Sequence, residues 1–177
     1  MEDKQEKLIT VQSLVKEVFE SMDAYSRGVK VEYSYCTLKQ FNARFENISS
    51  PTLIHVIPVN GNIYFDGQFG QDEPDTIFAF ADLTELDFVG EEHDQVVERM
   101  KRLAVDFIEA LNKSGYFEPL PERIEYMVPI ETMDEAFTGI IINVRLKEVQ
   151  GLFACGDEDW HRKGEDDNDM DGNEEHM

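Results

Sequence analysis

Hydrophobic residues recur at helical spacing in three segments of the chain. The first covers roughly residues 8–24, where either Thr10 or Ser13 is placed to cap the start. A second, shorter segment follows Thr37, which is a suitable N-cap. The longest runs over about residues 91–114 and carries a continuous apolar stripe. The pattern therefore predicts two short helices and one long helix.

Alternating and near-continuous hydrophobic runs predict strands between and after these helices. Residues 29–35 alternate between apolar and polar side chains, as in a half-buried strand. Residues 52–59 form an apolar run, and the dipeptide Asn60-Gly61 that follows favours tight primed turns. Residues 62–65 are therefore expected to return as the second strand of a hairpin. Further strands are predicted at residues 76–86, 122–130 and 137–149.

This order of elements predicts an α+β fold. We expect a mostly antiparallel sheet of about five to six strands, packed by the N-terminal helix and by the long central helix. The length of 177 residues favours one compact domain, which we place at residues 1–155. The apolar pattern stops after Cys155, so residues 156–177 are predicted to form an acidic, disordered tail.

The charge of the chain narrows the classes of partner. It has 38 acidic and 16 basic residues, a net charge of −22 at pH 7. The tail holds ten acids and two bases, which leave −8 there and −14 in residues 1–155. Such a charge repels phosphate backbones and argues against direct binding of DNA or RNA. Cys36 and Cys155, with no paired spacing, fit a reducing compartment, and no secretory or membrane-spanning segment is evident.

Signatures of catalysis or of cofactor binding are absent from the sequence. There is no nucleophile elbow and no phosphate-binding glycine loop, and the four histidines lack zinc spacing. His55, in a predicted strand, is interpreted as a satisfied histidine of the sheet. We therefore predict a protein that is not an enzyme and needs no cofactor. An enzyme based on clustered carboxylates stays open, because spacing does not show which acids converge.

The acidic tail contains one partial metal-binding pattern. Asp167, Asp169 and Asp171, followed by Gly172, match the first half of a calcium-binding loop. That loop needs a bidentate Glu at its twelfth position, whereas Met177 is only the eleventh residue. We therefore interpret the match as a result of the Asp-rich composition and predict no metal site.

Two places in the predicted domain carry candidate interface residues. The polar loop expected at residues 66–74 contains Phe69, a large aromatic residue among glycines, and Gln71. Phe69 either folds back onto the core or anchors a neighbouring subunit. The outward face of the last strand is one of the few basic places in the domain and is either simply solvated or paired with an acidic face of another copy. Its residues are Asn143, Arg145 and Lys147.

The succession of a helix, antiparallel strands, a long helix and closing strands resembles the tail-terminator and neck-completion proteins of tailed bacteriophages. Within this class, three segments are most similar in their pattern of residue types to ring proteins of crAss-like phages of gut bacteria: residues 53–65 (LIHVIPVNGNIYF), 76–88 and 137–155. The resemblance covers roughly residues 8–155 and rests on element order and segment texture.

The resemblance implies a structural virion subunit of the phage neck or tail that is synthesised in the host cytoplasm. Copies are expected to form a homomeric ring that connects capsid-portal and tail components around the DNA channel. The implied partners are the chain itself and neighbouring portal, neck or tail ring proteins, with DNA as passing cargo and no membrane. Two alternatives do not depend on the resemblance: an acidic DNA-mimic inhibitor, and the small carboxylate-based enzyme.

Overall fold

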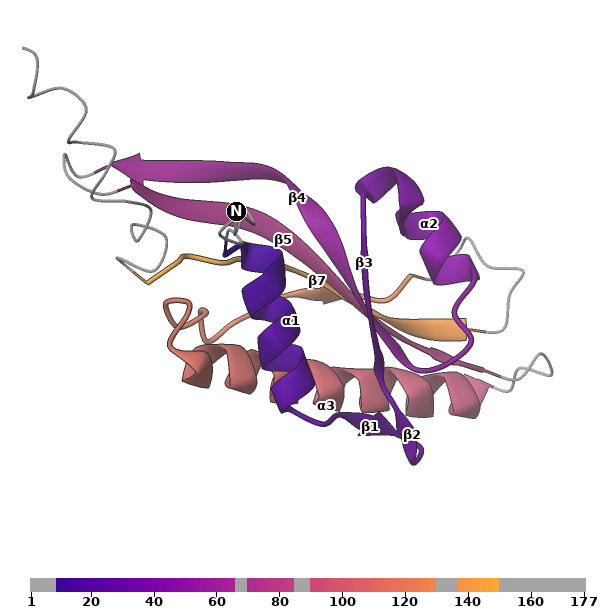
Figure 1. The fold of residues 1–177 in the computed structure, drawn as a ribbon. Coiled ribbons are helices and arrows are strands. Elements are labelled where there is room, and N and C mark those ends of the chain that lie inside the picture. Colours follow the sequence, from indigo (N-terminus) through magenta and orange to yellow (C-terminus); the bar gives the residue numbers. More distant parts are fainter. Residues whose placement is uncertain (1–8, 66–69, 85–89, 130–136, 150–177) are drawn as a thin grey trace, which may run out of the picture.

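A mixed sheet of five strands is the centre of the fold (Figure 1). The computed structural model describes residues 9–65, 70–84, 90–129 and 137–149. The sheet strands are β3 (Glu32–Cys36), β4 (Thr52–Phe65), β5 (Gly70–Leu83), β6 (Tyr126–Met127) and β7 (Phe137–Arg145). They lie in the order β3-β4-β5-β7-β6; β3 is parallel to β4, and the other neighbours are antiparallel. The predicted α+β fold is confirmed.

Helices cover the two faces of this sheet unequally (Figure 1). Helices α1 (Val11–Ser21) and α3 (Gly90–Ser114) pack on one face, and the short α2 (Leu38–Glu46) packs on the other. Successive strand residues point to opposite faces, so Leu53 and Phe78 belong to the larger core while Ile54 and Ala79 belong to the smaller one. Phe107 of α3 stacks edge-on against Phe78. The main core therefore lies between the sheet and α3.

Helix ends follow from side chains that the sequence places there. The Thr10 hydroxyl accepts a hydrogen bond from the Ser13 N–H at 3.2 Å, and the Ser13 hydroxyl accepts one from the Thr10 N–H at 3.0 Å. This reciprocal capping box starts α1. Gly115, with φ of +75°, follows the last residue of α3 in the left-handed conformation. All three predicted helices are confirmed, and the bounds of α3 differ by one residue from those predicted.

The predicted turn at Asn60-Gly61 is wrong. These residues lie inside β4, where Gly61 faces Pro74 of β5, and the chain reverses only after Phe65. A Cβ atom on Gly61 would lie 3.0 Å from the Glu73 carbonyl oxygen, so glycine serves close strand approach here rather than a turn. The predicted loop at residues 66–74 is corrected too, because its second half begins β5. The pairing of β4 with β5 sets the position of the turn. A single dipeptide cannot reveal that pairing.

A small hairpin beside the sheet was not predicted. Strands β1 (Tyr25–Ser26) and β2 (Val29–Lys30) pair through a turn at Arg27 and Gly28, which have φ of +51° and +76°. Val31 then separates β2 from β3, so the strand predicted at residues 29–35 is divided in two. The strand predicted at residues 122–130 shrinks to β6 at the sheet edge, as the nearby Pro129 suggested.

Gly139 in β7 provides a test of this sheet. A Cβ atom there would collide with the Phe80 carbonyl oxygen and lie 2.9 Å from the Ala81 Cα atom. We expect Gly139→Ala to lower the free energy of unfolding by about 1–3 kcal/mol, because the strands must shift apart. Gly70→Ala is the control, since its nearest neighbour is 3.9 Å away. Equal free energies of unfolding for the two variants, measured in urea, would contradict this register.

Candidate functional site

The paired strands β4 and β5 extend well beyond the rest of the sheet. β3 ends opposite Val56, whereas β4 and β5 stay paired as far as Phe65 and Gly70. β7 ends opposite Asp75, but the N–H groups of Leu146 and Glu148 still donate hydrogen bonds to the carbonyls of Pro74 and Asp72. We call this two-stranded extension, residues 57–65 and 70–75, the arm. Figure 1 shows the arm projecting past the helices at one end of the molecule.

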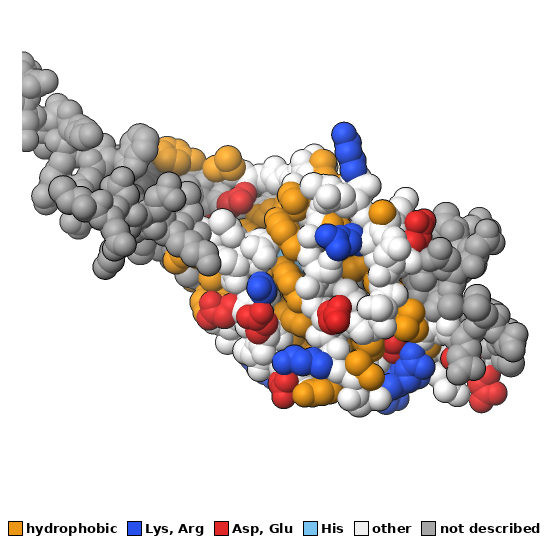
Figure 2. Space-filling model, turned by 45° about the vertical axis from the view of Figure 1, so that its right-hand side comes forward, with side chains coloured by type: hydrophobic (Ala, Val, Ile, Leu, Met, Phe, Trp, Pro, Cys, Tyr) orange, Lys and Arg blue, Asp and Glu red, His pale blue; other side chains and the backbone are white. Residues whose placement is uncertain are grey.

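One face of the arm exposes large apolar side chains. Residues directly opposite each other in the pairing share a face, so Ile63 lies beside Phe65 and Gly61 of its own strand and opposite Asp72 of β5. Ile63 is 81% exposed and Phe65 is 73% exposed. Figure 2 shows a few hydrophobic side chains exposed at this end of the molecule and others across the middle of the same face. Contiguous apolar side chains on a projecting element are typical of an interaction surface.

A groove of about 790 Å³ lies between the arm and the start of α1. Its apolar lining comes from three parts of the chain: Ile9 and Val11, Tyr35, and Pro58, Ile63 and Pro74. The arm therefore offers both a protruding apolar face and an adjoining hollow. Apolar anchors that enter such hollows dominate the affinity of many protein interfaces.

Among the described candidate interface residues, Gln71 lies in the outer part of the arm opposite Tyr64, and Arg145 lies at its base opposite Asp75. Gln71 donates a hydrogen bond from its side chain to the Glu148 carbonyl at 3.1 Å. The strand face predicted to point outward is exposed at Asn143 and Arg145, and Lys147 is half-buried. Phe69 lies outside the described residues.

Acidic residues of the same chain already pair with these bases. Arg145 Nε lies 2.9 Å from the Asp75 carboxylate, and Lys147 Nζ lies 2.9 Å from that of Glu118. The hydrogen bond with Asp75 raises the pKa of Arg145, and the one with Glu118 raises the pKa of Lys147. Both side chains are already paired within the chain. A partner that binds them would therefore have to replace Asp75 or Glu118.

Metal ligation finds no support in the part of the chain that the structure describes. No group of three or more His, Cys, Asp or Glu side chains gathers there in a way that could hold a metal ion. Asp167, Asp169 and Asp171 lie outside the described residues. Among the described helices, none is long and apolar enough to span a membrane.

His55 is a buried histidine of the sheet, but it is only half satisfied, whereas the sequence predicted a satisfied one. Its Nδ1 atom shares a hydrogen bond of 2.6 Å with the Tyr33 hydroxyl, and its ring packs 4.8 Å from that of Phe78. Its Nε2 atom is buried without a hydrogen-bond partner. Burial lowers the pKa of His55 to about 3 and raises the pKa of Tyr33. Both groups stay neutral near pH 7, which suits packing rather than acid–base catalysis.

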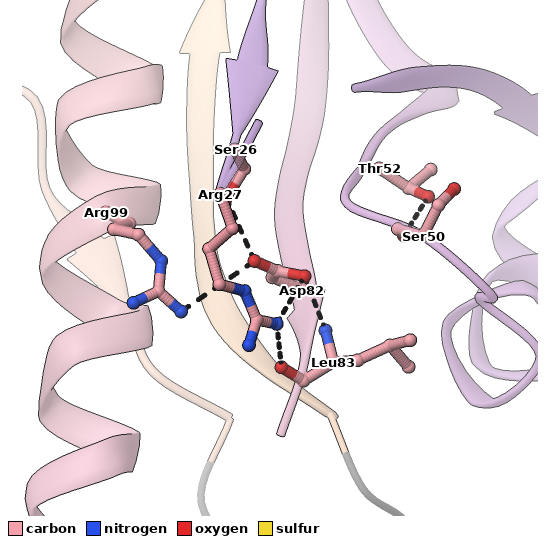
Figure 3. Close-up of polar contacts among 7 residues, drawn as sticks. All are labelled: Ser26, Arg27, Ser50, Thr52, Asp82, Leu83 and Arg99. Atoms are coloured by element: carbon pink, nitrogen blue, oxygen red, sulfur yellow. Dashed lines mark hydrogen bonds and ion pairs between the residues drawn. The ribbon is translucent and has the colours of Figure 1, made fainter. Parts of the chain in front are cut away.

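A buried carboxylate forms the second polar feature (Figure 3). Asp82, 1% exposed at the end of β5, accepts hydrogen bonds from the Ser26 hydroxyl at 2.9 Å and from Arg27 Nη2 at 3.0 Å. It also accepts one from the Leu83 N–H at 2.8 Å, while Arg99 Nη2 stays 3.8 Å away. This network ties the β1–β2 hairpin to the sheet across more than fifty residues of sequence.

The exposed arm face and the Asp82 network were not predicted from the sequence. The sequence does contain a pattern that indicates each of them. The unbroken apolar run from Ile63 to Phe65 precedes a polar, glycine-containing stretch instead of a buried connection. Asp82 interrupts an otherwise apolar strand, and a lone carboxylate in such a strand indicates a buried partner.

Comparisons with known proteins give no family for this chain. Neither a scan against protein-family models nor a search of curated proteins finds a match. Function is therefore inferred from the residues and their geometry.

The His55 environment predicts a specific dependence of stability on pH. Below about pH 6.5 the unfolded chain binds a proton at this residue, whereas the folded chain does so only near pH 3. The stabilising contribution of neutral His55 is thus complete above pH 6.5 and is lost as the pH falls toward 3, by about 1.4 kcal/mol per pH unit.

Urea unfolding of the wild type and of His55→Gln between about pH 7 and about pH 5 checks this. We expect the advantage of the wild type to shrink by about 2 kcal/mol over that interval, since the variant has no group to titrate. An equal loss of stability in both proteins would show that His55 titrates normally.

Proposed function

We propose that this chain is a structural subunit that assembles with copies of itself into a ring. In the narrower form of the proposal, the ring belongs to the neck or tail of a tailed bacteriophage and connects portal and tail components around the DNA channel. The arm is the observation that supports assembly. The narrower form rests on the resemblance in element order and segment texture described above.

The arm supports assembly because Ile63 and Phe65 are largely exposed and none of the described residues covers them. Large apolar side chains on a two-stranded ribbon lose stabilisation when they face water, by roughly 25 cal/mol for each Å² left exposed. A two-stranded hairpin is also marginally stable unless it packs against something. Contact with a neighbouring subunit would cover Ile63 and Phe65 and would hold the ribbon in place.

Ring closure needs two different complementary patches on each subunit. The apolar face of the arm is one. The second candidate is the sheet edge at β6, where Tyr126 and Met127 are exposed and one strand side has no neighbour in the sheet order. A two-residue edge strand offers few backbone groups for pairing, so the contact there would rest on the exposed side chains of Tyr126 and Met127. We propose that the arm of one copy contacts the β6 edge of the next.

The net charge agrees with a channel wall in such a ring. Residues 1–155 carry −14, which repels the phosphates of passing DNA and prevents adhesion. The same charge makes copies repel each other, so their association requires an apolar contact area. The exposed arm face supplies such an area.

Replacing Ile63 by Asp tests the proposal. The side chain is 81% exposed, so Ile63→Asp leaves the fold intact, while a charge in an apolar interface weakens association by about tenfold or more. We expect sedimentation velocity over a concentration series to show wild-type oligomers that Ile63→Asp shifts to monomers. Electron microscopy of the wild-type oligomer should show closed rings.

Leu38→Asp is the matched control, because Leu38 is 51% exposed on α2 and the substitution changes the charge identically. It should assemble as the wild type does. A wild type that stays monomeric over the whole series, or an Ile63→Asp variant that assembles normally, would contradict the proposal.

A further inference from the structure

A cleft of about 490 Å³ separates the β1–β2 hairpin from α3. Residues 22–27 form one wall, and residues 99–106 of α3 contribute the other. The cleft shares no lining residue with the groove beside the arm. Its volume lies in the range of sites that hold small molecules.

Basic residues outnumber acidic ones around this cleft, in contrast to the chain as a whole. Three arginines and two aspartates line it: Arg27, Arg99, Arg102, Asp23 and Asp106. The chain itself has more than two acids for each base. One of the two aspartates, Asp23, pairs with a lysine outside the cleft, at 3.4 Å from Lys30 Nζ. The lining is therefore locally positive on a strongly negative protein.

Two of the arginines lack the acceptors that a guanidinium normally finds. Arg99 Nε and Nη2 are buried without a hydrogen-bond partner. The Asp82 carboxylate, which Ser26 and Arg27 already occupy, remains 3.8 Å from Arg99 (Figure 3). Arg102 makes no hydrogen bond or ion pair with any residue that the structure describes. Buried donors without an acceptor cost stability, so an acceptor supplied from outside would be bound favourably.

The positions of these groups suit one kind of ligand. Residues three apart in a helix lie on the same side, so Arg99 and Arg102 approach the cleft together from α3. Nε and Nη2 form one edge of the planar guanidinium, the edge that binds two oxygens of a carboxylate or phosphate in parallel. The Arg99 side chain is 28% exposed and touches Asp82 only loosely, so it can turn this edge toward the cleft.

We propose that this cleft is a binding site for an oxyanion, the carboxylate or phosphate group of a small molecule, held between Arg99 and Arg102. Arg27 stays on Asp82 and keeps that buried charge neutralised, which prevents it from repelling the ligand. The site is independent of the proposed ring, and it adds a ligand to a chain whose sequence shows no cofactor motif.

Isothermal titration calorimetry of the full chain with inorganic phosphate, and separately with citrate, tests the site. We expect saturable binding of at least one ion at a single site, and the tighter of the two identifies phosphate or carboxylate as the preferred group. Arg102→Gln should weaken that binding about tenfold or more, because it removes a charged donor. Arg102 is exposed, so this variant should keep the wild-type circular dichroism and melting temperature.

Two further variants distinguish a specific binding site from non-specific electrostatic attraction of anions. Arg99→Lys keeps the charge but loses the two-nitrogen edge, and should weaken binding comparably. Arg123→Gln removes an 87% exposed arginine outside the cleft and should bind as the wild type does. Failure of both ions to bind, or equal weakening by Arg102→Gln and Arg123→Gln, would overturn the proposal. None of these outcomes depends on whether the chain forms rings.

Discussion

The antiparallel pairing of β4 with β5 is the constraint on which the other elements depend. Over its inner half, each strand is buried on both faces, with Leu53 and Phe78 toward α3 and Ile54 and Ala79 toward α2. A shift by one residue would exchange the two faces and place the aromatic side chains against the smaller core. The inner half thus fixes its own register, and the arm continues the pairing after a register shift between Val56 and Asn60.

The contacts that stabilise the fold and the proposed interaction sites lie in different parts of the structure. The packing of Phe107 on Phe78 and the anchoring of the β1–β2 hairpin by Asp82 serve the inner half of the structure. The arm contributes little to that core and exposes its apolar face, while the arginine cleft lies between the hairpin and α3. An exposed arm on a well-packed sheet fits a subunit that folds alone and gains further contacts on assembly.

How far the sequence predicts this structure depends on the range of the interactions involved. The bounds of α3 were predicted within a residue, because periodicity and capping are local. The Asn60-Gly61 turn was wrong because register is set by pairing across the sheet, and two residues cannot report it. The β1–β2 hairpin escaped prediction because strands of two residues have no period.

The same distinction holds for the candidate sites. Gln71, Arg145 and Lys147 were identified as candidates from the sequence. The ion pairs of Arg145 with Asp75 and of Lys147 with Glu118 depend on tertiary contacts that the sequence does not show. Ser26 and Arg27, which donate hydrogen bonds to Asp82, lie more than fifty residues away in sequence, so no spacing rule connects them to it. The lack of hydrogen-bond partners for Arg99 Nε and Nη2 is likewise seen only in the folded chain.

The register shift between Val56 and Asn60 gives the arm a geometric independence. This bulge ends the strictly alternating core portion of β4, so the ribbon beyond it has its own direction and twist. Because facing alternates with period two, removal of two residues from each strand would shorten the reach of the ribbon by about 7 Å and leave both faces unchanged. Reach is therefore adjustable in fixed steps without any change to the core, and the distance spanned by the proposed arm contact would change in the same steps.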